Sequence, residues 1–270
     1  MTARYGVIGH PLGHTMSPLL HNWGFRECGI DALYEAMPVT PAELTQFMVR
    51  ARVEPLAGLS VTIPHKQTIM GLLDGVSYAA SSLGAVNTVF WKEARLWGDN
   101  TDVLGVGTPL RGLGPFHSAL VLGAGGAARA VVFALMEMQV PEIFVAARDM
   151  AKTQALAATL AAKPVPWEDR AKVQTRLIVN TTPLGMLGER VDQSPWPKGA
   201  PLPPAATVFD IVYNPLKTRF LAQAEEAGCR TVSGLEMFLH QGLAQFRLWT
   251  GQNLDPDKVR DVLRKALEQE

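Results

Sequence analysis

The sequence has few cysteines, no excess of either charge and no long apolar run. Only two cysteines occur in 270 residues and they form no CxxC pair, so neither a disulfide framework nor a zinc site is expected. Lysine plus arginine equals aspartate plus glutamate at 25 each, which leaves no global field that would favour nucleic acid or an anionic membrane. No stretch approaches the roughly 18 consecutive apolar residues of a membrane span, and no repeat recurs at a fixed period.

What the sequence does contain is the composition of a globular protein that binds small ligands. Hydrophobic residues make up 47% and charged residues 19% of the chain, which at this length is enough apolar material for two cores. Residues 1–9 turn polar too early for a signal peptide and are typical of a first strand and its turn. A cytoplasmic protein is therefore expected, with neither nucleic acid nor membrane as a partner.

Short apolar runs alternate with amphipathic runs, which predicts α/β architecture with mainly parallel sheets. Strands are expected at residues 5–9, 33–38, 56–62, 86–91, 119–123, 142–147, 177–180 and 207–212. One helix is expected to begin at Ser17, with that serine as its N-cap, and another at Thr40 with a capping box to Glu43. Further helices are expected at 127–138, 236–249 and 256–268, and the proline-rich stretch 188–206 is expected to be a surface loop.

Residues 120–128 combine a buried strand, a tight glycine turn and the start of a helix. Gly123, Gly125 and Ala128 fit the GxGxxG/A pattern. The first glycine makes the turn, the second lets the backbone approach a pyrophosphate, and the small third residue lets helix and strand pack closely. Because the expected helix and the next strand supply the required context, the pattern predicts a dinucleotide site rather than a purely structural turn.

The end of the strand at 142–147 bears on the choice between NADP and NAD. Arg148 and Asp149 follow it. An arginine at this place suits the 2′-phosphate of NADP, whereas an acidic residue suits the ribose hydroxyls of NAD. Arg148 therefore favours NADP, whereas Asp149 leaves NAD as an alternative cofactor. The alternative for both residues is the exposed start of a helix with Asp149 as its N-cap.

Three clusters of polar residues occur in the first half of the chain. Thr15 and Ser17 bracket a helix start, where a carboxylate could bind, unless Ser17 only caps the helix. Lys66 is expected in the first turn of a helix, where a cation opposes the helix dipole, so it is either a surface lysine or a functional one. Asp102 closes a glycine-bounded turn near an expected domain boundary, and it either bonds its own backbone or lies in a cleft.

Together these clusters resemble the shikimate dehydrogenase family. The motifs stand in the family's order, as HTMSP at 14–18, VTIPHK at 61–66, GAVNT at 84–88, GDNTD at 98–102, GAGGAAR at 123–129, NTTPLGM at 180–186, DIVYNP at 210–215 and HQG at 240–242. They span almost the whole chain. As an ordered set they are far more specific than any one motif.

The resemblance implies an enzyme that reversibly reduces 3-dehydroshikimate to shikimate with NADPH, in chorismate and aromatic amino-acid biosynthesis. It implies two domains: an α/β substrate-binding domain made of residues 1–103 and 235–270, and a Rossmann-type NADP-binding domain at 104–234. A monomer or homodimer is expected. Two alternatives stay open, a quinate/shikimate dehydrogenase that uses NAD and a catalytically inactive sensor of a shikimate-type ligand.

The family's residue roles transfer position by position, with Lys66 and Asp102 as the catalytic pair. The implied substrate-binding residues are Thr15, Ser17, Thr62, Lys66, Asn87, Asp102, Tyr213 and Gln241. The implied cofactor-binding residues are Gly123, Ala124, Gly125, Gly126, Ala127, Arg148, Thr181, Thr182, Pro183, Ile211, Gly234 and Met237, and no metal is implied. The chain departs from the family at Thr15, where serine is usual, and at Ser60, where asparagine is common. It also departs at Asp149, which weakens the case for exclusive use of NADP.

Overall fold

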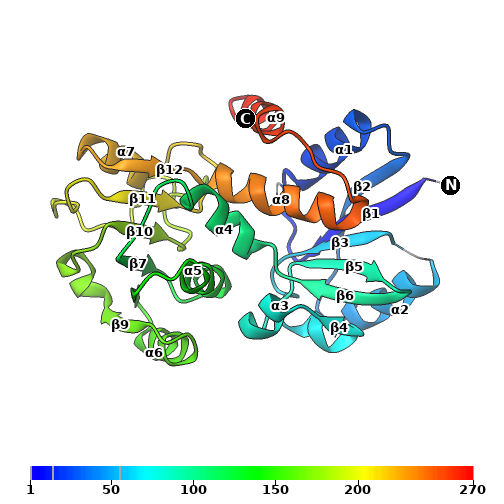
Figure 1. Ribbon diagram of the computed structural model, residues 1–270, viewed down its shortest axis with the longest axis horizontal. Coiled ribbons are helices and arrows are strands. Elements are labelled where there is room, and N and C mark those ends of the chain that lie inside the picture. Colours follow the sequence, from blue (N-terminus) through cyan, green and yellow to red (C-terminus); the bar gives the residue numbers. More distant parts are fainter. Residues whose placement is uncertain (1, 14, 55, 270) are drawn as a thin grey trace. The chain divides into compact units, whose positions relative to one another are not determined.

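A computed structural model describes residues 2–13, 15–54 and 56–269 of the chain. His14, the first residue of the HTMSP motif, lies outside these ranges. The chain divides into two compact units: Met1–Thr101 with Gln241–Leu263, and Asp102–His240 with Arg264–Glu270. Each unit has a six-stranded sheet, shown in Figure 1. The division into a substrate-binding domain and an NADP-binding domain stays a prediction.

The sheet of the first unit has the order β2-β1-β3-β5-β6-β4. Its strands are β1 (Ala3–Gly9), β2 (Ala32–Pro38), β3 (Gly58–Val61), β4 (Gly75–Val76), β5 (Thr88–Lys92) and β6 (Arg95–Asp99). β1 is parallel to β2 and β3, whereas β5 is antiparallel to both β3 and β6. The carboxyl ends of β1, β3 and β6 therefore meet the amino end of β5 at one edge of the sheet.

Helices cover this sheet and enclose its core. They are α1 (Ser17–Glu27), α2 (Leu44–Val53), η1 (Thr68–Leu72), α3 (Tyr78–Leu83), the C-terminal part of α8 (Gly234–Thr250) and α9 (Pro256–Leu267). α1 lies against β1 and β2, and its Gly24 packs so closely on Phe246 of α8 that an added Cβ would collide with that ring. Buried Ile8, Leu59 and Ile69 belong to one apolar cluster of this unit.

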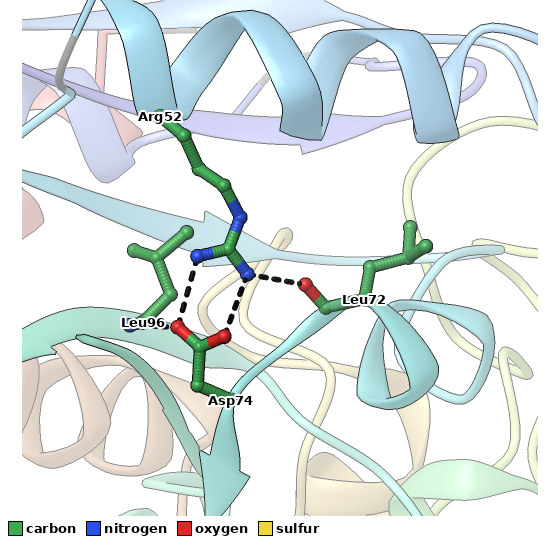
Figure 2. Close-up of polar contacts among 4 residues, drawn as sticks. All are labelled: Arg52, Leu72, Asp74 and Leu96. Carbon is green, nitrogen blue, oxygen red and sulfur yellow. Dashed lines mark hydrogen bonds and ion pairs between the residues drawn. The ribbon is translucent and has the colours of Figure 1, made fainter.

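A charged cross-link ties α2 to the edge of this sheet, as Figure 2 shows. Arg52 donates to the two carboxylate oxygens of Asp74, at 2.9 and 3.2 Å, and to the carbonyl of Leu72 at 3.0 Å. Asp74 also accepts the backbone N–H of Leu96, at 2.7 Å. The hydrogen bonds from Arg52, followed by the one from Leu96, hold the pKa of Asp74 below its usual value. This bidentate contact secures β4, which has only two residues.

The sheet of the second unit is parallel throughout and has the order β12-β11-β10-β7-β8-β9. Its strands are β7 (Ser118–Leu122), β8 (Glu142–Ala147), β9 (Lys163–Pro166), β10 (Leu177–Asn180), β11 (Thr207–Asp210) and β12 (Arg230–Val232). This is the strand order of doubly wound dinucleotide-binding sheets, in which ligands bind at the carboxyl ends where the order reverses. Here that point lies between β7 and β10.

The helices of the second unit are α4 (Asp102–Leu110), α5 (Gly126–Glu137), α6 (Met150–Thr159), η2 (Trp167–Lys172) and α7 (Arg219–Glu226). α6 packs on β8 and β9, and α7 packs on β11 and β12 at the other end of the sheet, as can be followed in Figure 1. The stretch 188–206 has no helix or strand, as predicted. It is not wholly a surface loop, because Trp196 and Leu202 are buried in the core beside Phe220.

All eight predicted strands form, with ends that differ by no more than two residues from the expectation. The strands β4, β6, β9 and β12 were not predicted. β4 and β12 have only two and three residues, and β9 contains Pro164 and Pro166, which a strand tolerates only at a sheet edge. The sheets are mainly parallel as predicted; the exceptions are the two pairings that involve β5.

Two predicted helix starts are wrong. Ser17 is the first residue of α1 and Met16 holds the N-cap position, without a side-chain cap, because the Ser17 hydroxyl bonds to Thr15 instead. α2 begins at Leu44 rather than at Thr40, because the N–H of Glu43 closes a turn onto the carbonyl of Thr40 at 3.1 Å. The Glu43 carboxylate still accepts the N–H of Thr40 at 2.9 Å, which is one half of the predicted capping box.

The two cysteines are not bonded to each other. Cys28 and Cys229 are both free thiols, the first half-buried and the second buried, so the chain has no disulfide framework, as expected. Within residues 2–13, 15–54 and 56–269, no helix combines the length and apolar character needed to cross a bilayer.

Candidate functional site

The glycine turn after β7 has the backbone that a phosphate-binding loop needs. Gly123 has φ of +120°, and a Cβ on it would collide with Thr181 Oγ1, so a larger residue would be strained there. Gly125 and Gly126 instead face open space. Gly125 precedes α5 and gives it no side-chain cap. The N-terminal amides of α5 therefore lack a side-chain cap and point to where an anion can reach them.

The turn after β10 is joined to the glycine turn. Thr181 donates its N–H and its hydroxyl to the carbonyl of Leu122, at 2.8 and 2.7 Å. At the next strand, the N–H of Ile211 donates to the carbonyl of Asn180 at 3.1 Å, and Gly234 packs so closely on Ile211 that a Cβ would collide with its carbonyl. Most of the predicted cofactor residues thus lie along one edge of this sheet. They are Gly123, Ala124, Gly125, Gly126, Ala127, Thr181, Thr182, Pro183, Ile211 and Gly234.

In the first unit, hydroxyl groups gather where β1 and β3 end. The Thr15 hydroxyl donates to Ser17 Oγ at 3.2 Å and accepts the N–H of Ser17 at 3.3 Å. Thr62 directly follows β3, and its N–H donates to the carbonyl of Ile8 in β1 at 2.9 Å. These hydroxyl groups therefore lie after neighbouring parallel strands, at the edge where β5 begins.

Lys66 lies in a turn between β3 and η1, not in the first turn of a helix as predicted. The segment after β3 winds only into turns and then into a short 3₁₀ helix that begins at Thr68. Two contacts fix the turn: His65 Nε2 lies 2.6 Å from the carbonyl of Val39, and the carbonyl of Lys66 accepts the N–H of Val86 at 2.7 Å. Lys66 is half-buried, and its backbone is tied to the residue before Asn87.

Asn87 sits at the amino end of β5 in a buried polar cluster. Its Oδ1 accepts the Thr88 hydroxyl at 2.7 Å and the N–H of Thr101 at 2.7 Å. Its Nδ2 donates to the Thr101 hydroxyl at 3.0 Å. Thr101 in turn precedes Asp102, a buried residue that begins α4. Thr15, Ser17, Thr62, Lys66 and Asn87 thus come together at one sheet edge.

Comparison with known proteins identifies the family. Residues 7–89 match the family model for the shikimate dehydrogenase substrate binding domain, and residues 234–264 match that for the shikimate 5′-dehydrogenase C-terminal domain. The shikimate dehydrogenase (NADP(+)) of Oleidesulfovibrio alaskensis is 49% identical over 265 residues, which cover 97% of this chain and 95% of that protein. The chain belongs to the shikimate dehydrogenase family.

Solved structures of relatives confirm the predicted fold class. The shikimate 5-dehydrogenase of Thermus thermophilus, in complex with NADP(H) and shikimate, is similar with a TM-score of 0.89 and 38% identity, covering 98% of this chain and 100% of that one. The quinate dehydrogenase of Corynebacterium glutamicum, in complex with NAD, is similar with a TM-score of 0.91 and 31% identity, covering 98% and 99%. The family fold is thus found with either nicotinamide cofactor.

Within this family fold, Arg148 and Asp149 have different environments. Asp149 is the N-cap of α6: its carboxylate accepts the N–H of Lys152 at 3.1 Å and pairs with the Lys152 ammonium at 3.4 Å. These contacts, first of all the backbone hydrogen bond, lower the pKa of Asp149. The N-cap alternative for Asp149 is therefore correct. Arg148 is exposed at the end of β8.

Asn180 and Asp210 support the cofactor edge from inside the sheet, and sequence reasoning did not include them among the site residues. They are partners in register, and Asn180 Nδ2 donates to Asp210 at 2.8 Å. Asn180 Oδ1 accepts the N–H and the hydroxyl of Thr182, at 2.9 and 2.7 Å. Thr218 and Val212 donate to Asp210 at 2.7 and 3.1 Å. Burial raises the pKa of Asp210 to about 6 in spite of these donors. The motifs NTTPLGM and DIVYNP contain both residues, but their spacing gives no sign of the pairing.

The remaining predicted site residues lie after β11 and on α8. Tyr213 follows β11, and its ring lies 5.1 Å from that of Phe238. Met237 and Gln241 are both half-buried. Because they are four residues apart on α8, they share one face of that helix.

Proposed function

We propose that this chain is an NADP-dependent shikimate dehydrogenase, which reversibly reduces 3-dehydroshikimate to shikimate. The observation that carries the proposal is that the chain holds both parts of such a site. One part is an uncapped α5 N-terminus beside a glycine turn in which a larger residue would be strained. The other is a sheet edge with hydroxyl, amide and ammonium groups. Relatives that are 40–49% identical bear the name of this activity.

The cofactor part of the proposal rests on residues 104–234 and on Met237 of α8. The amides at the start of α5 suit the pyrophosphate, and Arg148 suits the 2′-phosphate of NADP through a charge-assisted bond. Asp149 does not compete for this place, because its carboxylate is held by Lys152. When bound, NADPH supplies the hydride. The turn Thr181, Thr182 and Pro183, with Ile211, Gly234 and Met237, would then line the ribose and nicotinamide.

The substrate part rests on residues 1–103 and 235–270 and on Tyr213, which follows β11. Thr15 and Ser17 present two hydroxyl groups next to the start of α1, which suits the carboxylate of shikimate. The hydroxyl and amide groups of Thr62, Asn87, Tyr213 and Gln241 suit the ring hydroxyls. No metal is needed for this binding mode.

Lys66 and Asp102 are assigned to the proton transfer. In the reduction, Lys66 gives a proton to the oxygen of the substrate carbonyl, and in the oxidation it takes the proton from that hydroxyl. Asp102, as the second member of the pair, accepts a hydrogen bond from a substrate hydroxyl. The turn that contains Lys66 is fixed by the bond between its carbonyl and the N–H of Val86, the residue before Asn87.

The test is the Lys66→Ala variant, with Lys92→Ala as its matched control. Lys92 is an exposed lysine of the same unit at the opposite end of β5. Loss of general acid–base catalysis should lower kcat by at least about a hundredfold, while the KM for shikimate changes much less. Lys92→Ala should retain wild-type kinetics. A Lys66→Ala variant with near-wild-type kcat would remove Lys66 from the mechanism.

A further inference from the structure

In the first unit, a continuous chain of hydrogen bonds links buried polar side chains and ends at Asn87, on the sheet edge proposed to bind the substrate. The Tyr34 hydroxyl donates to Ser60 at 2.6 Å, and Ser60 donates to Gln245 Oε1 at 2.9 Å. Gln245 Nε2 donates to the Thr88 hydroxyl at 3.0 Å, and Thr88 donates to Asn87 Oδ1 at 2.7 Å. None of the five residues is more than 6% exposed. We refer to Tyr34, Ser60, Gln245 and Thr88 as the relay.

Backbone groups fix the direction of every bond in the relay. Gln245 Nε2 also donates to the carbonyl of Asn87 at 3.2 Å, and a carbonyl can only accept. The Gln245 amide therefore turns its nitrogen toward Asn87 and its oxygen toward Ser60. At the other end, the N–H of Thr101 can only donate, and it donates to Asn87 Oδ1. Neither amide can be flipped without placing two donors or two acceptors face to face.

Aromatic rings shield the relay: His21 stacks on Tyr34 with centroids 4.5 Å apart, and the Trp249 ring centroid lies 6.0 Å from that of Tyr34. In such a low-dielectric setting, hydrogen bonds are strong and geometrically demanding.

We propose that Gln245 is a positioning residue for substrate recognition. Through the relay it holds the Asn87 carboxamide with its oxygen turned into the protein. A ligand oxygen that reaches Asn87 therefore meets the donor end of its amide, which also donates to the Thr101 hydroxyl at 3.0 Å, and the site selects an accepting oxygen at this place. Gln245 does not contact the ligand itself. The inference rests on the proposed function, because it takes Asn87 as a substrate-binding residue.

Three variants test the proposal through steady-state kinetics of shikimate oxidation with NADP. Gln245→Met keeps the length of the side chain and removes its hydrogen bonds, and Thr88→Val removes the next hydroxyl at nearly constant shape. Each should raise the KM for shikimate about tenfold, the scale of one hydrogen bond, while kcat and the KM for NADP stay within about twofold. Thr88→Ser keeps the hydroxyl and should restore the wild-type KM. The double variant should match either single variant, because both changes break one relay.

Thr175→Val is the matched control for a buried threonine. Thr175 is 3% exposed and donates to the carbonyl of Leu177 at 3.1 Å, and it lies outside the proposed site, so its variant should keep the wild-type KM for shikimate. If Thr88→Val leaves the KM for shikimate unchanged, or shifts both KM values equally, the positioning role is refuted. This readout holds even where Gln245→Met fails to fold. Absence of shikimate oxidation by the wild-type protein would instead refute the proposed function and the inference with it.

Discussion

The buried imidazole of His21 makes folding stability depend on pH in a way that can be calculated. His21 is 1% exposed and lies among the rings of Tyr34, Phe246 and Trp249. Within the described residues, no hydrogen bond of normal geometry reaches either ring nitrogen. Burial lowers the pKa of His21 from 6.5 to about 3, and the nearby Gln245 side chain opposes this only in part. The imidazole is therefore neutral in the folded protein, and below the unfolded value of 6.5 it takes up a proton when the chain unfolds.

The sign and size of the effect follow from these two pKa values. Above the unfolded value of 6.5 His21 is neutral in both states, so its stabilising contribution is fully present there. As the pH falls below this value, the unfolded state binds the proton first and stability is lost. At about pH 5, roughly 1.5 units below the unfolded value, the loss is about 2 kcal/mol at 1.36 kcal/mol per unit.

The assay is urea unfolding of the wild type and of His21→Phe, followed by tryptophan fluorescence at several pH values. Only the difference in the free energy of unfolding between the wild type and His21→Phe is used, because Asp210 and other groups titrate in both proteins. The pKa of Asp210 is raised, which gives it the opposite slope: its carboxyl favours folding at low pH. Between about pH 8 and about pH 5, the wild type should lose about 2 kcal/mol relative to the variant. A difference that does not change with pH would show that His21 titrates alike in the folded and unfolded states.

Three further predictions concern the cofactor edge and the cross-link of the first unit. Arg148→Ser should raise the KM for NADP at least about tenfold, the scale of a charge-assisted hydrogen bond, and leave the KM for NAD unchanged; equal effects on both would exclude a contact with the 2′-phosphate. Gly123→Ala should destabilise the protein by roughly 1–3 kcal/mol in urea unfolding, since φ is +120° there and the new Cβ meets Thr181; an unchanged midpoint would contradict this strain. Asp74→Asn should lower the urea midpoint at neutral pH. That deficit should shrink as the pH falls through and below the usual value of 3.8, because the lowered pKa of Asp74 stabilises the fold only while the carboxyl is charged; a deficit independent of pH would assign the effect to shape alone.

The sequence predicts those features that depend on local pattern. Strands such as β8 and β10 contain continuous apolar runs, at 143–147 and 177–179, and the limits of both strands were predicted to the residue. The glycine turn at Gly123 was predictable because its conformation and its crowding by Thr181 leave room for little else. The edge strand β9 could not be predicted, because its two prolines argue against a strand. A strand at the edge of a sheet nevertheless tolerates them.

Features that depend on contacts between residues far apart in the chain could not be predicted from the sequence. Ser60 and Gln245 are 185 positions apart and 2.9 Å apart in space, and no periodicity links them. Ser17 resembled an N-cap, but its hydroxyl bonds to Thr15 instead. The choice between cap and cofactor contact at Asp149 depends on where one carboxylate points, and only the bonds to Lys152 decide it.

The most direct test of the central claim is a steady-state assay of shikimate oxidation with NADP and with NAD in parallel, followed by the absorbance of the reduced cofactor. We expect turnover with a kcat/KM for NADP at least about tenfold above that for NAD, because Arg148 contributes a contact that NAD cannot make. A higher kcat/KM with NAD would contradict the choice of cofactor. Binding of NADP and shikimate without formation of NADPH would contradict the enzyme itself.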